Sequence, residues 1–392
     1  MRRPSRMPDW DPAALEVAGR LRALIGAELA AAGGQLPFDR FMELALYAPG
    51  LGYYAAGSAK LGADGDFVTA PEISPLFGAC LAVQCAEMLH RLGGGDILEL
   101  GAGSGALAVQ VLERLAGLDA LPHRYWILEP SPDLRERQRE RIAGDLPHLA
   151  DRCRWCDGLP TALRGVVLAN EVLDAMPVHR FRIGPCGETL ELMVRAGDNG
   201  FEEIAAPPRS PGLVEAVAAL RSRGLALAPC YTSEINLRLG PWLRALGEAI
   251  GAGVALLIDY GYPDSVYYGP DRCMGTLMCY LRHQAHGDPY RHPGLQDLTA
   301  HVDFSAAARA GQAAGLEVAG FASQAQFLIG CGIDRLLAEA SDSAAPELDL
   351  LLGAKQLLLP QAMGERFQVL GLAKGVAGPW CGFSIRDLRD RL

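Results

Sequence analysis

Asp96–Gly105 reads DILELGAGSG, and this stretch decides the fold class. Asp96–Leu100 is a short, mostly apolar run typical of a buried strand, and Ala106–Leu115 continues with the apolar period of a helix. The three glycines between them let the backbone turn sharply and come close to a ligand, while the first helical turn offers free N–H groups. The stretch therefore predicts a strand, a glycine-rich turn and a helix that together bind a small molecule.

Six further runs along the chain have the length and composition of strands, and helical patterns separate most of them. They are Tyr125–Leu128, Arg152–Cys156, Gly165–Ala169, Val254–Ile258, Leu316–Phe321 and Phe367–Ala373. Strands that alternate with helices form a parallel sheet that is covered on both faces. We therefore predict an α/β protein with a Rossmann-like core, built on a mostly parallel seven-stranded sheet.

The segments outside this alternation indicate the domain organisation. Residues 1–75 are predicted to form an N-terminal helical region and a lid loop, the loop being the irregular, charged stretch Asp66–Ser74. Residues 76–392 are predicted to form the core. Two insertions interrupt it at about 178–242 and 262–299, because turn-forming residues and isolated strand-like pieces replace the strand–helix pattern there.

Composition and charge exclude several classes of partner. The 392-residue chain has a formal net charge of −10, whereas nucleic-acid binding needs clustered cations. No uncharged apolar run reaches the ~18 residues of a membrane span, and no signal-peptide apolar segment follows the basic start. The ten cysteines are scattered, as suits free thiols in a reducing compartment. We expect a cytoplasmic protein that binds no nucleic acid and does not insert into a membrane.

The glycine turn alone leaves two cofactors open. Gly101, Gly103 and Ala106 satisfy the dinucleotide fingerprint G-x-G-x-x-A, and Glu129 ends the second strand where a ribose-binding acid belongs. An NAD(P)-dependent oxidoreductase is therefore one alternative. Glu99 favours the other, because a carboxylate beside the glycines would repel a pyrophosphate but attract the sulfonium and ammonium groups of S-adenosyl-L-methionine. The residues favour a methyltransferase that uses this cofactor.

Longer strings show that the chain resembles a known family. They include Gly65–Ser74 (GDFVTAPEIS), Asn170–Pro177 (NEVLDAMP), Ile258–Tyr262 (IDYGY) and Asp297–Phe304 (DLTAHVDF). Over about Leu36–Lys374 the sequence is similar to the MidA family, which comprises bacterial proteins and mitochondrial arginine methyltransferases that assist the assembly of respiratory complex I. The resemblance implies a class I methyltransferase core and methylation of a protein arginine. It also implies a protein substrate, the quinone-site core subunit of NADH:quinone oxidoreductase.

The predicted cofactor site gathers around the turn, with Glu99, Gly101, Gly103 and Gly105. Glu129 is expected to accept both ribose hydroxyls, and Asn170 to bind the methionine part of the cofactor. Asp157, after the third strand, is placed to accept from the adenine amino group, although it can equally be an acid of the turn before Gly158. No metal is expected, because the spacing of His283, His286, His292 and His301 matches no usual set of ligands.

Catalysis on arginine calls for carboxylates, because a guanidinium is always protonated and its nitrogens are poor nucleophiles. A carboxylate that grips the other nitrogens can localise charge away from the attacking one and aim it at the methyl group. Glu171 and Asp174 would share one face of a helical turn, so they are predicted to form this clamp, with Glu72 as a third member. Two alternatives stay open: Asp174 only caps the turn before Pro177, or the protein is a noncatalytic assembly factor that binds the cofactor without turnover.

Overall fold

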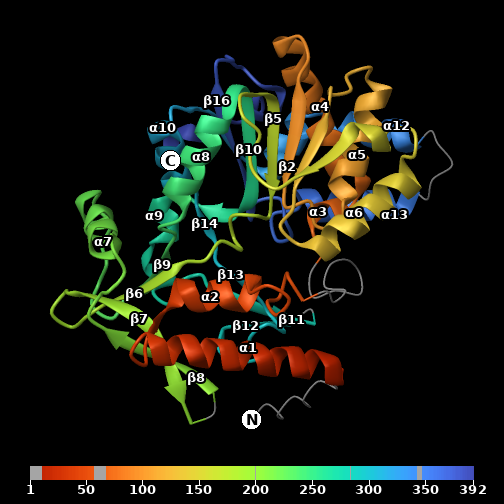
Figure 1. Ribbon diagram of the computed structural model, residues 1–392. Helices are drawn as coiled ribbons and strands as arrows, with labels where there is room; N and C mark the ends of the chain where they lie inside the picture. The colour runs from red at the N-terminus through yellow and green to blue at the C-terminus, as the bar shows by residue number, and fades with distance from the viewer. Residues whose placement is uncertain (1–10, 57–67, 199, 283, 342–346) are drawn as a thin grey trace.

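The computed structural model describes residues 11–56, 68–198, 200–282, 284–341 and 347–392, and it shows an α/β core with a second lobe beside it (Figure 1). The second lobe is formed by the N-terminal helices and most of the two insertions. The predicted lid loop is Asp66–Ser74, and its first two residues, Asp66 and Phe67, lie outside the described ranges.

The main sheet contains eight strands. Its order is β15 (Glu317–Ser323), β16 (Phe367–Lys374), β10 (Ile250–Tyr262), β5 (Leu163–Asn170), β2 (Asp96–Leu100), β3 (Tyr125–Leu128) and β4 (Cys153–Cys156), with β14 (Val302–Asp303) beside β10. The strands from β10 to β4 are parallel, whereas β16 is antiparallel to both β10 and β15. The α/β fold class is confirmed. The sheet has one strand more than the predicted seven, because the two-residue β14 is too short to leave a pattern in the sequence.

Alternate residues of the parallel strands point to opposite faces of the sheet, and helices cover each face. Ile97 of β2 and Val166 of β5 pack into one apolar core, while their neighbours Leu98 and Val167 pack into the other. Burying such an aliphatic side chain contributes about 1.5–3 kcal/mol, so both layers stabilise the sheet. Helices of the first layer are α4 (Pro75–Leu92), α5 (Ala106–Gly117), α6 (Pro132–Asp145), α11 (Gln324–Gly330), α12 (Ile333–Ser341) and α13 (Glu347–Leu358); those of the second are α8 (Leu239–Ala249) and α10 (Phe304–Ala313).

The second lobe has a core of its own, to which the N-terminal region and both insertions contribute. Leu21 and Phe41 from the N-terminal helices pack with Val194 of the first insertion and with Cys279 and Leu298 of the second. Its elements are α1 (Pro12–Ala31), β1 (Leu36–Pro37), α2 (Phe38–Tyr47), β6 (His179–Ile183), β7 (Thr189–Gly197), β8 (Gly200–Ala206), α7 (Leu213–Ser222), β9 (Thr232–Ile235), α9 (Asp264–Tyr267), β11 (Met278–Leu281), β12 (Gln284–His286) and β13 (Asp297–Thr299). No described helix combines the length and the apolar composition that crossing a bilayer requires.

The connections of the main sheet locate a binding site. The chain runs from β2 to β3 and β4 on one side, and then returns past β2 to β5 and β10 on the other. Open α/β sheets bind ligands at such a switch point, beyond the carboxyl ends of the strands. The first insertion leaves the sheet here, after β5, and the predicted boundary at residue 242 falls inside α8, a helix that already covers the sheet.

Candidate active site

The glycine turn after β2 has the backbone conformation that its sequence predicts. Gly101, Gly103 and Gly105 all have positive φ angles, of 64°, 54° and 82°. L-residues with side chains rarely adopt this left-handed region, so each position favours glycine. Gly105 is the N-cap of α5, and the N–H of Gly101 donates to the carbonyl of Leu128 at 3.0 Å. The turn is therefore tied to the end of β3.

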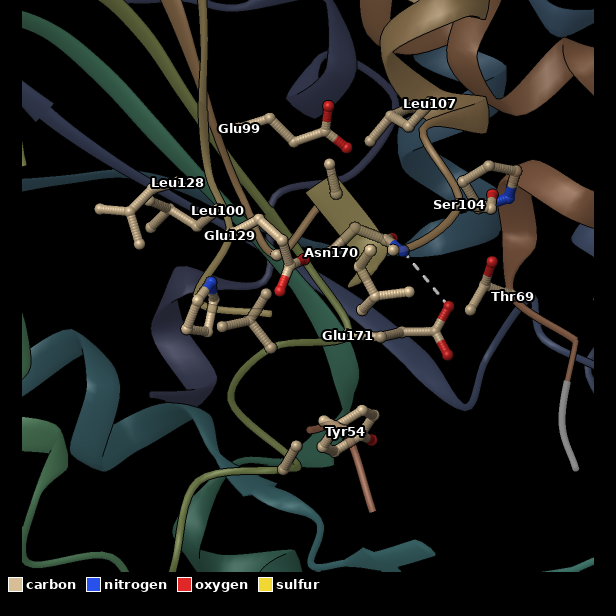
Figure 2. A pocket seen from close by; sticks show the side chains of 18 of the residues that line it. Tyr54, Thr69, Glu99, Leu100, Ser104, Leu107, Leu128, Glu129, Asn170 and Glu171 are labelled. Atoms are coloured by element: carbon tan, nitrogen blue, oxygen red, sulfur yellow. Dashed lines mark hydrogen bonds between the residues drawn. The ribbon is translucent and has the colours of Figure 1, made fainter. Parts of the chain in front are cut away.

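A cavity of about 430 Å³ opens beside this turn, at the carboxyl ends of β2, β3 and β5 (Figure 2). It is within the size range of cofactor sites. Seven of the ten predicted site residues line it: Glu72, Glu99, Gly101, Gly103, Glu129, Asn170 and Glu171. Gly105, Asp157 and Asp174 are not among the lining residues. The structure thus brings most of the predicted site together from four separate parts of the chain.

Glu129 and Glu99 are the buried acids on the cofactor side. Glu129 is 4% exposed, and its carboxylate accepts from the Ser131 N–H at 3.0 Å and from the Gln138 amide at 3.3 Å. Burial raises its pKa. Glu99 is 3% exposed and accepts from the Tyr125 hydroxyl at 2.7 Å, and burial raises its pKa to about 7. A cationic ligand in the cavity would favour the charged form of both acids.

Asn170, at the end of β5, has a buried acceptor that the described residues leave unpartnered. Its Nδ2 donates to Glu171 Oε1 at 3.2 Å, but no described residue donates to its Oδ1. Buried polar atoms nearly always have a partner, so a donor from a ligand is expected here. The ammonium of S-adenosyl-L-methionine is such a donor, and the glycine turn, the two acids and this amide together fit that molecule.

Glu171 follows Asn170 in the chain, and in Figure 2 it lies between Asn170 and Tyr54. Its φ angle is 53°, and its N–H donates to the carbonyl of Ile258 at 2.9 Å. The Ala70 N–H and the Asn170 amide both reach Oε1, at 3.4 and 3.2 Å. Among the described residues, both of these donors reach Oε1 and none is found at Oε2. Burial, and then the charge of Asp174, raise the pKa of Glu171 to about 8.

The predicted helical turn between Glu171 and Asp174 is not formed, because a positive φ at Glu171 turns the chain out of helical geometry. Asp174 is buried outside the cavity, where its carboxylate accepts from the Tyr260 hydroxyl and its N–H donates to Asp259 at 3.2 Å. The two carboxyl groups therefore do not face the cavity as a pair. The charge of Asp174 nevertheless contributes to the raised pKa of Glu171.

Glu72 and Asp157 are already engaged by arginines. Glu72 lines the cavity, yet its carboxylate accepts from Arg141 at 2.8 Å and from the Ser104 hydroxyl. This pairing balances its charge and leaves it poorly suited to be a third clamp residue. The Asp157 side chain is 92% exposed and pairs with Arg135 at 2.7 Å. Asp157 is not among the cavity-lining residues, although the next residue, Gly158, is. Its contact with adenine therefore stays a prediction, beside the alternative of an acid of the turn before Gly158.

Sequence reasoning assigned no role to several other lining residues. Tyr47 and Tyr54 reach the cavity from the N-terminal region, and Trp242 reaches it from α8. Their side chains lack the charge or the spacing that singles out a catalytic residue. The sequence offers one signal for Tyr54: the string Gly52-Tyr53-Tyr54 is a further part of the family resemblance.

The half-buried acid at position 171 makes stability depend on pH. The raised pKa of about 8 means that folded Glu171 keeps a proton that the unfolded chain loses near its ordinary value of 4.5. This contribution to stability is fully present below that lower value and is lost as pH rises toward 8, at up to about 1.4 kcal/mol per pH unit. In ligand-free protein, Glu171→Gln should therefore lose less stability than the wild type between these two pH values.

Urea unfolding of both proteins across this pH range measures the effect. Other buried acids, among them Glu99, Asp174 and Asp259, titrate in both proteins. The difference between the two curves therefore reports Glu171 together with the effect of its charge on Asp259. Parallel curves would show that Glu171 is ionised in the ligand-free protein at neutral pH.

Comparisons with known proteins point to the same cofactor that fits the cavity. Residues 80–322 match a family model described as "Putative S-adenosyl-L-methionine-dependent methyltransferase". The protein arginine methyltransferase NDUFAF7 of Danio rerio mitochondria is 31% identical, over 86% of this chain and 83% of its own length. The human protein of the same name is 27% identical, over 86% and 80%. A Burkholderia thailandensis protein crystallised with S-adenosyl-homocysteine is 40% identical with a TM-score of 0.93, covering 99% of this chain and 100% of that one.

Proposed function

We propose that this chain, which belongs to the family of S-adenosyl-L-methionine-dependent methyltransferases, transfers the methyl group to an arginine of a protein substrate. S-adenosyl-L-methionine is the cofactor, as the family and the S-adenosyl-homocysteine bound to the Burkholderia protein indicate. Family membership removes the dinucleotide oxidoreductase alternative. Support for arginine comes from the relatives named as protein arginine methyltransferases and from the position of Glu171.

Glu171 is the single observation that carries the proposal. The cofactor supplies an electrophilic methyl group on a positively charged sulfur. Glu171 lines the same cavity next to Asn170, and among the described residues its Oε2 has no hydrogen-bond donor. A guanidinium that donates to this oxygen would be held by a charge-assisted hydrogen bond, and its positive charge would be drawn toward the carboxylate. The nitrogen that attacks is thereby made a better nucleophile and is oriented at the same time.

The surrounding residues adjust the charge of that carboxylate. A bound guanidinium lowers the pKa of Glu171 from its ligand-free value of about 8, so the acid is ionised when the substrate is in place. Methyl transfer forms a carbon–nitrogen bond, breaks the carbon–sulfur bond and releases one proton from the attacking nitrogen. Glu171 can accept that proton, because its burial and then the charge of Asp174 raise its pKa.

We extend the proposal to the substrate and the compartment. The resemblance to mitochondrial assembly proteins supports a substrate in respiratory complex I, the quinone-site core subunit of NADH:quinone oxidoreductase. A cytoplasmic location is supported by the ten cysteines, none of which forms a disulfide in the structure. The cavity does not favour the alternative of a noncatalytic assembly factor, because a scaffold has no use for a half-buried carboxylate beside the cofactor.

Mass spectrometry of proteins from cells with and without this gene tests the proposal. We expect at least one methylated arginine to disappear in the deletion strain, and to return when the wild-type gene is restored. Restoration with a gene that encodes Glu171→Gln should return the protein but not the modification. Unchanged arginine methylation across all strains would contradict the function proposed here.

A further inference from the structure

Two tyrosines of the N-terminal region form one wall of the cavity. Tyr47 is the last residue of α2, and Tyr54 lies in the turn that follows. Their rings are stacked, with centroids 5.6 Å apart and planes at 25°. The turn is fixed because the N–H of Tyr54 donates to the carbonyl of Leu46 at 2.9 Å. In Figure 2, Glu171 lies between Tyr54 and the acid Glu99, so Tyr54 is at the end of the cavity away from the cofactor acids.

The hydroxyls of both tyrosines are already used within the protein. Tyr47 donates to the carbonyl of Ala175, and Tyr54 donates to Asp297 Oδ1, each at 2.9 Å. Each hydroxyl has a single proton to give, so neither can donate to a ligand. Besides hydroxyl oxygens that can still accept, the pair therefore offers a molecule in the cavity its aromatic rings, which these two hydrogen bonds hold in place.

Negative charge lies behind these rings. Asp297, the partner of the Tyr54 hydroxyl, is 2% exposed. Burial, and then the charges of Asp297 and Asp174, raise the pKa of Tyr47, and burial with the charge of Asp297 raises that of Tyr54. Both phenols thus stay neutral and in the field of buried acids. A hydrogen bond to a carboxylate also enriches the electron density of a phenol, and an electron-rich ring attracts a cation more strongly.

We propose that Tyr54, backed by Tyr47, is the specificity-determining wall on which the guanidinium of the substrate stacks as it reaches Glu171, and that this wall selects arginine over lysine. The inference rests on the proposed function. A guanidinium is planar, delocalised and weakly hydrated, so it can lie flat on a ring while its edge donates to a carboxylate. A lysine ammonium is a compact and strongly hydrated charge that gains less from the ring and loses more water.

A simple packing role is the competing explanation for Tyr54, because its ring also contacts the core of the second lobe. Tyr290 provides the matched control. It packs against the same core, its hydroxyl also donates to a carboxylate, Glu203 at 3.4 Å, and it does not line the cavity. Tyr290→Leu therefore removes the same ring from the same core and leaves the wall intact.

The experiment titrates N-acetyl-arginine amide and N-acetyl-lysine amide into the protein saturated with S-adenosyl-homocysteine, followed by NMR. The wild type is expected to prefer the arginine probe by about tenfold or more, and Tyr54→Leu to lose most of that preference. Tyr54→Phe, which keeps the ring, and Tyr290→Leu should stay within about threefold of the wild type. The affinity for S-adenosyl-homocysteine should not change in any variant.

Three results would contradict the proposal that Tyr54 selects arginine. They are a wild type with no preference for the arginine probe, a Tyr54→Leu variant that keeps the preference, and a loss of S-adenosyl-homocysteine affinity as large as the loss for arginine. A loss of S-adenosyl-homocysteine affinity would indicate that the Tyr54 ring contacts the cofactor instead of the substrate. These outcomes are separate from a failure of the proposed function, which shows itself as unchanged arginine methylation in the deletion strain.

Discussion

Glu171→Gln is expected to slow methyl transfer by about two orders of magnitude or more, the usual scale for removing one preorganised electrostatic contact. Glutamine keeps the size of the side chain but loses the negative charge that draws the substrate cation. The affinity for S-adenosyl-homocysteine should stay within a few-fold, because Glu129, Glu99 and the glycine turn are unchanged. The variant therefore distinguishes an effect on catalysis from an effect on cofactor binding. It also distinguishes an enzyme from a noncatalytic assembly factor, which would show no methyl transfer to lose.

Single-turnover transfer of labelled methyl to a protein fraction measures the first quantity, and calorimetry with S-adenosyl-homocysteine measures the second. Asp174→Asn is the matched control: it removes a nearby charge that lies outside the cavity, so it should have a milder effect. The double variant should be less than additive, because Asp174 acts through Glu171. Near-normal transfer by Glu171→Gln would mean that Glu171 does not hold the substrate.

Gly103→Val is expected to weaken S-adenosyl-homocysteine binding by about two orders of magnitude, the effect of filling a tightly used space. Gly103 lines the cavity, and its φ angle of 54° is one that a β-branched residue resists. Strain of this kind costs about 1–2 kcal/mol, which a domain of ordinary stability tolerates. The fold should therefore persist while the cofactor site is lost.

Gly212→Val is the control for backbone strain alone. Gly212 is the N-cap of α7 with a φ angle of 84°, and no atom lies within 4 Å of where its Cβ would be. It should lose stability but keep the wild-type affinity in calorimetry. NADH serves as the control for ligand class, and no heat is expected from it. Unchanged affinity in a folded Gly103→Val protein would make the turn purely structural.

The sheet could be predicted from the sequence because its strands are apolar and well separated. The predicted strands Asp96–Leu100 and Tyr125–Leu128 coincide with β2 and β3, and the other five overlap their counterparts. The switch point then follows from chain order, and it places the ends of β2 and β5 together. For this reason, residues next to the glycine turn and at the end of β5 could be assigned to one cavity without a structure.

The direction of a side chain on a loop could not be predicted in the same way. Spacing alone put Glu171 and Asp174 on one helical face, but the positive φ of Glu171 sends their carboxyl groups to different places. Likewise, Asp157 follows β4 as expected, but its side chain pairs with Arg135 of α6 and does not line the cavity. Such outcomes depend on contacts between distant segments. The tyrosine wall is a further case, since it forms only when the N-terminal region packs on the insertions.

The packing of the N-terminal region on the insertions affects which part of the gene must be passed on for activity to be kept. A fragment that begins at Pro75 would retain every strand of the main sheet and both of its helical layers. It would nevertheless lack Tyr47, Tyr54 and Glu72, which line the cavity from the other side. A gene fusion or duplication that carried only these strands and helices would thus transmit the sheet and the glycine turn without the tyrosine wall. The segment that defines the fold class and the segments that line the cavity are different lengths of chain.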